Sequence, residues 1–210
     1  PEMVSMAPRT NLGLVSLEDR TTPATIGALD TSFATGGKLI TDFGGADSFN
    51  AAVVQPDGKI VAVGTNGIDF VVARILSNGT YDPTFGVNGS GRVTIDFGSN
   101  TEEAYAVALD PSGRILVAGW TAAGDGDMAI ARLNGSTGLL DSTFGVSGTQ
   151  TINVLNTDKA YALTLAPTSN EIVLAGLAND DDIGVVRLAA NGQAPPLSSK
   201  VINFASSTEE

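Results

Sequence analysis

Apolar residues fall in short runs separated by turn residues, and two of these runs form a clear pair. Residues 51–54 and 60–63 are apolar at every position, which indicates strands buried on both faces. Between them stands Pro56-Asp57-Gly58, in which Pro presets φ and Gly can adopt the left-handed conformation that a tight turn needs. The pattern therefore predicts an antiparallel hairpin of two doubly buried strands.

Two further strands complete the unit that this hairpin begins. Residues 70–76 form a third apolar run, and residues 92–97 alternate more, as in a strand that is wet on one face. Inner strands buried on both faces and a wetter outer strand are typical of a β-propeller blade, whose sheet packs between two neighbouring sheets. The alternative is a flat β-sandwich, but each of its strands would show one polar face.

The same unit recurs along the chain. An Asp, a Phe and a Gly keep a fixed spacing in three places, Asp30-Phe33-Gly37, Asp82-Phe85-Gly89 and Asp141-Phe144-Gly148. Each unit also carries a Pro, a Gly and an Arg in register: Pro56, Pro111 and Pro167; Gly64, Gly119 and Gly176; Arg74, Arg132 and Arg187. A period of roughly 50 to 60 residues matches one four-stranded blade.

The repeat predicts an all-β fold, a β-propeller with three four-stranded blades. The expected strands are 51–55, 60–64, 69–76 and 92–97; 105–109, 115–119, 128–133 and 149–154; and 161–165, 172–176, 183–188 and 200–204. Residues 38–43 are left over, with the character of an outer strand whose three inner strands are missing. The units cover about 28–80, 81–139 and 140–192, a fourth begins at 193–210, and residues 1–27 form a loosely ordered arm.

The end of the chain suggests a larger ring. Residues 202–210 echo residues 95–103, which are followed by the first strand of a blade. We expect the three blades to belong to a larger propeller, closed by further units or by a second chain. An open arc would expose apolar blade faces that favour self-association.

Composition removes several classes of function. The net charge is −12 and no patch of Lys or Arg is present, which argues against nucleic acid or an anionic membrane as partner. No apolar stretch is long enough to span a membrane. Because the chain has neither His nor Cys, it cannot build a Ser-His-Asp or Cys-His catalytic centre.

The repeated polar residues have two readings. Arg74, Arg132 and Arg187 could bind an anion in the channel, but their presence in every unit favours a structural ion pair with the Asp of the following phrase. Tyr105 and Tyr161, aligned with Ala51 of unit one, begin inner strands, so packing is favoured over catalysis.

Function specific to this chain is expected where the units differ, in the loops after the repeated Gly. These loops lie on one rim of the propeller and carry Trp120, Asp125 and Asp127, then Asn179, Asp180 and Asp182. A carbohydrate could stack on Trp120, and Ca²⁺ could bind Asp125, Asp127, Asp180 and Asp182, although no complete calcium-loop template is present. The alternative is a solvated, Gly-rich turn with a partly packed Trp. No other cofactor is expected.

Two resemblances add to this interpretation. The segment LDTSFATGGKLITDFGGADSFNAAVVQPDGKIVAVG resembles the bacterial delta-60 repeat, a β-propeller family of unknown function found in large, often secreted proteins. Unit three departs from it, because Gln193-Ala194-Pro195-Pro196 stands where the Asp-Phe phrase is expected. LEDRTTPA, at residues 17–24, is similar to a segment near the N-terminus of many exported planctomycete proteins, which implies an extracellular or envelope location.

Two functional hypotheses follow. The favoured one is a non-catalytic, extracellular propeller scaffold that presents its rim loops to a protein or a glycan. The alternative is a lyase or hydrolase acting on a polysaccharide, with Asp, Arg or Tyr side chains near the channel.

Overall fold

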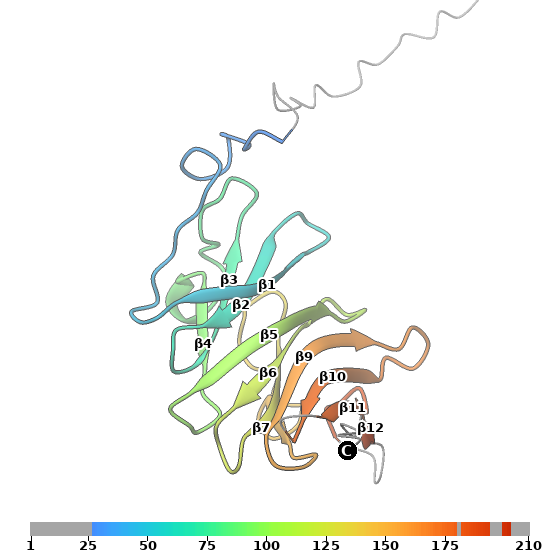
Figure 1. Ribbon diagram of the computed structural model, residues 1–210. Coiled ribbons are helices and arrows are strands. Elements are labelled where there is room, and N and C mark those ends of the chain that lie inside the picture. The colour runs from blue at the N-terminus through green and yellow to red at the C-terminus, as the bar shows by residue number, and fades with distance from the viewer. Residues whose placement is uncertain (1–26, 180–181, 194–198, 203–210) are drawn as a thin grey trace, which may run out of the picture.

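The computed structural model describes residues 27–179, 182–193 and 199–202, the last of these as backbone only. Three antiparallel four-stranded sheets follow one another along the chain (Figure 1). Their strands are β1 (Ser48–Val54), β2 (Ile60–Thr65), β3 (Phe70–Ile75) and β4 (Arg92–Ile95); β5 (Glu102–Leu109), β6 (Ile115–Thr121), β7 (Asp127–Leu133) and β8 (Thr149–Ile152); β9 (Asp158–Leu165), β10 (Ile172–Ala178), β11 (Asp182–Leu188) and β12 (Ser199–Ile202). Within the described residues the only helical element is the short 3₁₀ turn η1 (Val87–Gly89). The predicted all-β fold with three four-stranded blades is confirmed.

The blades are arranged around their first strands. β1, β5 and β9 are neighbours, and the later strands of each sheet fan outward from them (Figure 1). Apolar side chains fill the space between successive blades, which explains why the inner strands are apolar on both faces. One core lies between blades one and two and includes Val61, Val72 and Val117, and a second lies between blades two and three and includes Ile130 and Leu174.

Each first strand begins three residues before its predicted start and contains a β-bulge. The pairing with the second strand skips Asn50, Tyr105 and Tyr161, so these three residues occupy corresponding positions. Our alignment of the tyrosines with Ala51 is therefore wrong by one residue. The bulge also explains the repeated Gly: a Cβ on Gly119 would lie 1.9 Å from the Glu103 carbonyl oxygen, and Gly64 and Gly176 are equally confined.

Residues 38–43 lie outside the three blades, as expected, but the prediction that they form a strand is wrong. Only Lys38 takes part in isolated bridges, to Ala34 and Thr35. A strand needs a partner edge, and the described residues include no inner strands for this segment to pair with. It is instead anchored beside blade one, where Arg92 Nη1 donates to the Asp42 carbonyl oxygen at 2.6 Å.

Several predictions concern residues outside the described ones. They are the N-terminal arm, most of the fourth unit and the details of the Asp-Phe replacement at residues 194–196.

Each blade has two ends, because its strands run antiparallel. We call one the clamp end: it holds the turns between the first two strands and the Asp-Phe phrases. We call the other the acidic end: it holds the turns between the second and third strands and the links to the next blade, including residues 66–69, 96–101, 122–126 and 153–157.

Candidate functional site

At the clamp end, the repeated Arg forms a buried ion pair with the Asp of the following phrase. Arg74 Nε donates to Asp82 Oδ2 at 2.9 Å, and both residues are 2% exposed. Arg74 also donates to Thr84 Oγ1 at 3.0 Å and lies over the ring of Phe85, 4.4 Å from its centroid. The phrase thus supplies an anion, a hydroxyl acceptor and an aromatic face to one guanidinium.

The same arginine also holds the next blade. Arg74 donates to the backbone carbonyl oxygens of Gly135 and Ser136 in blade two, the latter at 2.7 Å. Blade two repeats the arrangement: Arg132 pairs with Asp141 at 2.9 Å and donates to the Ala190 carbonyl oxygen of blade three. These contacts confirm the structural interpretation of both arginines.

Blade three differs from the other two. Arg187, whose side chain is 57% exposed, forms an ion pair with Glu171 at 3.0 Å. Glu171 lies at the start of the neighbouring strand rather than in an Asp-Phe phrase. The ion pair between Arg187 and Glu171 is thus more exposed than the pairs of blades one and two.

Hydrogen bonds and positive charge shape the pKa values at the clamp end. For Asp141, the Thr143 hydroxyl and amide and the Arg132 guanidinium hold the pKa below its usual range despite partial burial. Burial raises the pKa of Asp82, but the Thr84 hydrogen bonds and the charges of Arg74 and Lys59 outweigh it, and the net shift is downward. Both carboxyls are thus held in the ionised form.

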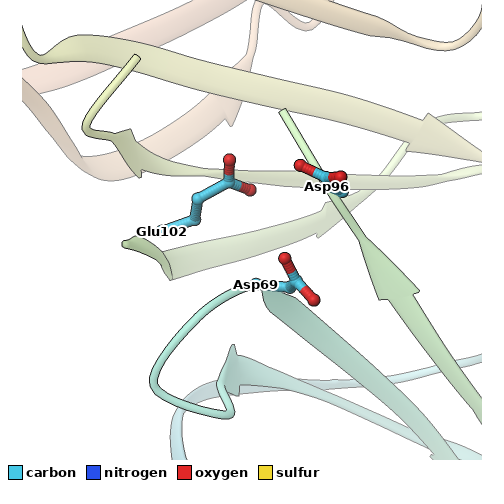
Figure 2. Close-up of side chains that lie close together, drawn as sticks. All are labelled: Asp69, Asp96 and Glu102. Atoms are coloured by element: carbon cyan, nitrogen blue, oxygen red, sulfur yellow. The ribbon is translucent and has the colours of Figure 1, made fainter. Parts of the chain in front are cut away.

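At the acidic end, carboxylates from two blades meet. Asp69 from the start of blade one's third strand, Asp96 from the end of its fourth and Glu102 from the start of blade two lie side by side (Figure 2). One oxygen from each lies within 4.8 Å of the others. We call this group junction one.

Junction one satisfies its most buried carboxylate with hydrogen bonds. Glu102, 1% exposed, accepts from the amides of Phe97 and Ser99 and from the hydroxyls of Ser99 and Thr121. Burial nevertheless raises the pKa of Glu102, and burial followed by the charge of Asp96 raises the pKa of Asp69. The charge of Asp96 therefore acts on Asp69, while the hydrogen bonds to Glu102 offset part of the cost of burying its carboxylate.

The equivalent positions between blades two and three form junction two. They hold Asp127, Asn153 and Asp158 in place of Asp69, Asp96 and Glu102. Asp125, in the preceding loop, joins them and accepts a hydrogen bond from Asn153 Nδ2 at 2.9 Å. Burial, then the charges of Asp125 and Asp158, raise the pKa of Asp127.

The residues predicted from the rim loops divide into two groups. Asp125 and Asp127 belong to junction two, and Trp120 lies beside it at the end of β6 rather than in the loop. Asn179 accepts a hydrogen bond from Asn156 at 2.8 Å, and Asp182 is buried at the start of β11. Asp180 lies outside the described residues, so the predicted grouping of Asp125 and Asp127 with Asp180 stays a prediction.

Trp120 is partly packed. The ammonium group of Lys159 lies over its ring, 4.5 Å from the centroid, and the indole Nε1 is buried. One face of the ring is therefore already in contact with a cation, which leaves less surface for a sugar to stack on.

Sequence reasoning missed Asp69, Asp96, Glu102, Asn153 and Asp158 because each junction is assembled from three strands of two blades. A signal was present. Each link that leads into the first strand of a blade carries two polar residues five or six positions apart. These pairs are Asp42 and Asp47, Asp96 and Glu102, and Asn153 and Asp158. In each pair the side-chain carboxylate of the second residue accepts a hydrogen bond from the backbone amide that directly follows the first residue. These amides belong to Phe43, Phe97 and Val154.

The inner strands carry a smaller polar group at the bulges. Tyr105 donates to Glu103 Oε2 at 2.9 Å, and its ring packs 5.0 Å from that of Tyr161. Asn50 donates to Glu103 Oε1 at 3.0 Å. Burial and the neighbouring Glu103 raise the pKa of Tyr105, so the phenol is harder to ionise than a free tyrosine.

Two segments of the chain match the model of a known family, a β-propeller domain of unknown function (DUF5122). The matched residues are 55–85 and 111–144, each running from the first turn of a blade to the Phe of its phrase. The chain is a β-propeller repeat protein. No protein of curated function matches this β-propeller protein. In the part that the structure describes, no helix is long and apolar enough to cross a membrane.

Proposed function

We propose that this β-propeller protein is a non-catalytic scaffold, outside the cell or in its envelope, whose acidic end binds a protein or a glycan. One observation carries the proposal: the repeated Arg and Asp of blades one and two form ion pairs, and each Arg also holds the next blade. Arg74 and Arg132 are buried and reach the next blade instead of lining a site. The units differ from one another in the length and residues of the loops at the acidic end, so a binding function specific to this chain is proposed there.

The pair of inner-strand tyrosines bears on the enzymatic alternative. A polysaccharide lyase or hydrolase needs a side chain that accepts or donates a proton near neutral pH. The raised pKa of Tyr105 keeps its phenol protonated near neutral pH, so it offers no ready base there, and the chain has no His or Cys. The environment of these tyrosines thus favours packing.

The proposal also includes contact with another blade. Val173, Ile183 and Val185 on blade three correspond to Leu116, Met128 and Ile130, which are buried against blade three. Ile183 is 43% exposed and the two valines are half-buried. We propose that a blade of the same kind covers this face, supplied by a second copy or by a further unit. Light scattering on the purified chain tests the second copy: a dimer or larger species is expected, and a cooperatively melting monomer would contradict it.

A glycan array and a panel of candidate partner proteins test the scaffold function. The wild-type chain is compared with a variant in which the loop 122–126 is replaced by the shorter loop 66–69. Binding is expected to be lost in this variant and retained in Asp57→Ala, a control at the exposed turn of the clamp end. Release of reducing ends or unsaturated sugars from a polysaccharide by the wild-type chain would instead establish the enzymatic alternative.

A further inference from the structure

The first Asp-Phe phrase is built like the other two but lacks an arginine. Ser32 donates its amide and its hydroxyl to Asp30 Oδ1, at 2.9 and 2.6 Å. Thr84 makes the same two hydrogen bonds to Asp82 Oδ1, at 2.9 and 2.7 Å. In that phrase the other carboxylate oxygen accepts from Arg74. Asp30 is exposed instead, and it forms no ion pair with a Lys or Arg in the part of the chain that the structure describes.

Blade three shows the converse, an arginine that no phrase follows. Arg187 occupies the repeated Arg position, but residues 193–196 read Gln-Ala-Pro-Pro where the Asp-Phe phrase is expected. Its side chain is 57% exposed beside Glu171, whereas those of Arg74 and Arg132 are 2% exposed. Because a guanidinium carries five N–H donors, Arg187 can accommodate a second carboxylate.

The first phrase already sits on blade one as the phrase of a preceding blade would. In blade one's own phrase, the Gly86 amide donates to the Thr137 carbonyl oxygen of blade two at 2.8 Å. Ala34, at the same position of the first phrase, donates to the Asn78 carbonyl oxygen of blade one at 2.8 Å. The first phrase is therefore held in the position that joins one blade to the next.

Residues 38–43 continue this phrase with the pattern of an outer strand. They read Lys-Leu-Ile-Thr-Asp-Phe, and residues 92–97, which include β4, read Arg-Val-Thr-Ile-Asp-Phe. β4 pairs with β3, but the amides from Leu39 to Asp42 donate to no backbone carbonyl oxygen of the described residues. Ile40 is 91% exposed. An unpaired edge of this kind adds readily to the edge of another sheet.

An apolar hollow of about 230 Å³ lies beside this segment. It opens on the face of blade one that points away from blade two, because its lining residue Val71 follows Phe70, which lies in the core between these blades. Phe49, also in the lining, is 38% exposed, whereas Ala104 at the same position of blade two is fully buried in that core. The exposed face of blade three fits such a hollow, since Ile183 corresponds to Phe70.

We propose that residues 30–43 of one copy of this chain dock on blade three of a second copy. Asp30 pairs with Arg187 of the second copy, and residues 38–43 lie along its β11 in place of β12, which brings no Asp-Phe phrase to Arg187. Two such contacts join two copies in a closed ring of six blades, three from each copy, and propellers typically have about four to eight. The inference rests on the proposed contact of blade three with a second copy, and it names the surface that meets blade three.

Sedimentation equilibrium of the full chain tests this docking through its charges. The wild type is expected to be a dimer, and Asp30→Arg and Arg187→Asp should each weaken it by about tenfold or more. The double variant exchanges the two charges and should recover the wild-type Kd to within about threefold. The matched control is Asp57→Arg, which makes the same change in charge at the exposed turn between β1 and β2 and should leave the Kd unchanged.

The outcomes separate this docking from the contact on which it rests. A wild-type dimer that neither charge variant weakens would overturn the docking and leave the contact of blade three in place. A double variant that stays as weak as the single ones would overturn the pairing of Asp30 with Arg187. A monomeric wild type would overturn both the docking and the contact, without bearing on the glycan array. Below the Kd of the dimer, Arg187 returns to its exposed ion pair with Glu171.

Hydrogen exchange in the dimer gives a second reading. The ladder between β3 and β4 starts where the Arg74 amide donates to the Gly91 carbonyl oxygen at 2.9 Å, so every second amide of β4 points toward β3. By this register the amides of Leu39 and Thr41 meet the second copy, and that of Ile40 does not. The first two should exchange about tenfold more slowly, or slower still, in the dimer than in the monomer, and the third at an unchanged rate. Equal rates for all three amides would contradict the strand pairing.

Discussion

At the clamp end each buried Asp faces an arginine, whereas at the acidic end carboxylates from two blades face one another. Asp82 is paired with Arg74, and its pKa is lowered. Glu102 and Asp127 are held beside other carboxylates, and their pKa values are raised. One end of the propeller thus pairs its buried carboxylates with arginines that hold adjacent blades, while the other gathers carboxylates from two blades.

The largest effect is expected from breaking the clamp. Arg132→Ala leaves Asp141 and the Ala190 carbonyl oxygen without their donor, and we expect a loss of about 3–5 kcal/mol in the free energy of unfolding. Arg187→Ala is the matched control, because the Arg187 side chain is 57% exposed, and it should cost less than about 1 kcal/mol. Urea unfolding followed by circular dichroism measures both. Equal losses would show that burial of the pair does not matter.

A smaller effect should separate the two junctions. Glu102→Gln puts an amino group where the carboxylate accepts several N–H and O–H donors, and we expect it to destabilise by about 1–3 kcal/mol. Asp158→Asn, measured in EDTA, should be neutral or stabilising because it removes a buried charge whose Oδ1 has no donor. A larger loss for Asp158→Asn than for Glu102→Gln would contradict the proposed difference.

The pH dependence of stability should report both ends in one curve. Asp69, Glu102 and Asp127 have folded-state pKa values above the unfolded 3.8 or 4.5, so stability should rise as pH falls from neutral through these values. Asp82 and Asp141 have folded-state pKa values below 3.8, so their contribution is present above that pH and is lost as pH falls below it. The urea midpoint should therefore pass through a maximum in mild acid, in EDTA.

Asp69→Asn and Asp127→Asn should flatten the limb between neutral pH and the maximum without changing the acid limb. A midpoint that falls steadily from pH 7 downward in the wild type would refute the assignment of repulsion to the acidic end. Of the three mutational effects, this one is expected to be the smallest, because Asp69 and Asp127 are only partly buried.

Much of the fold could be predicted from the repeat, and much of the site could not. The strands of blades one and two, and the pairing of Arg74 and Arg132 with the following Asp, follow from residues a few positions apart in one unit. The start of β5 was misplaced because a bulge at Tyr105 leaves no mark in hydrophobicity. Junction two was only half predicted: Asp125 and Asp127 share a loop, but Asp158 comes from the next blade.

The sequence by itself determined the blade. Strand and turn chemistry, and the pairing of Arg132 with Asp141, depend on local geometry that recurs whenever the same residues recur at the same spacing. Only the tertiary structure decided which carboxylates meet across blades and which of them lack a donor. The physical reason is that the satisfaction of a buried charge depends on every group around it in space: Ser99 and Thr121 donate hydroxyl groups to Glu102, whereas Asp158 Oδ1 has no donor.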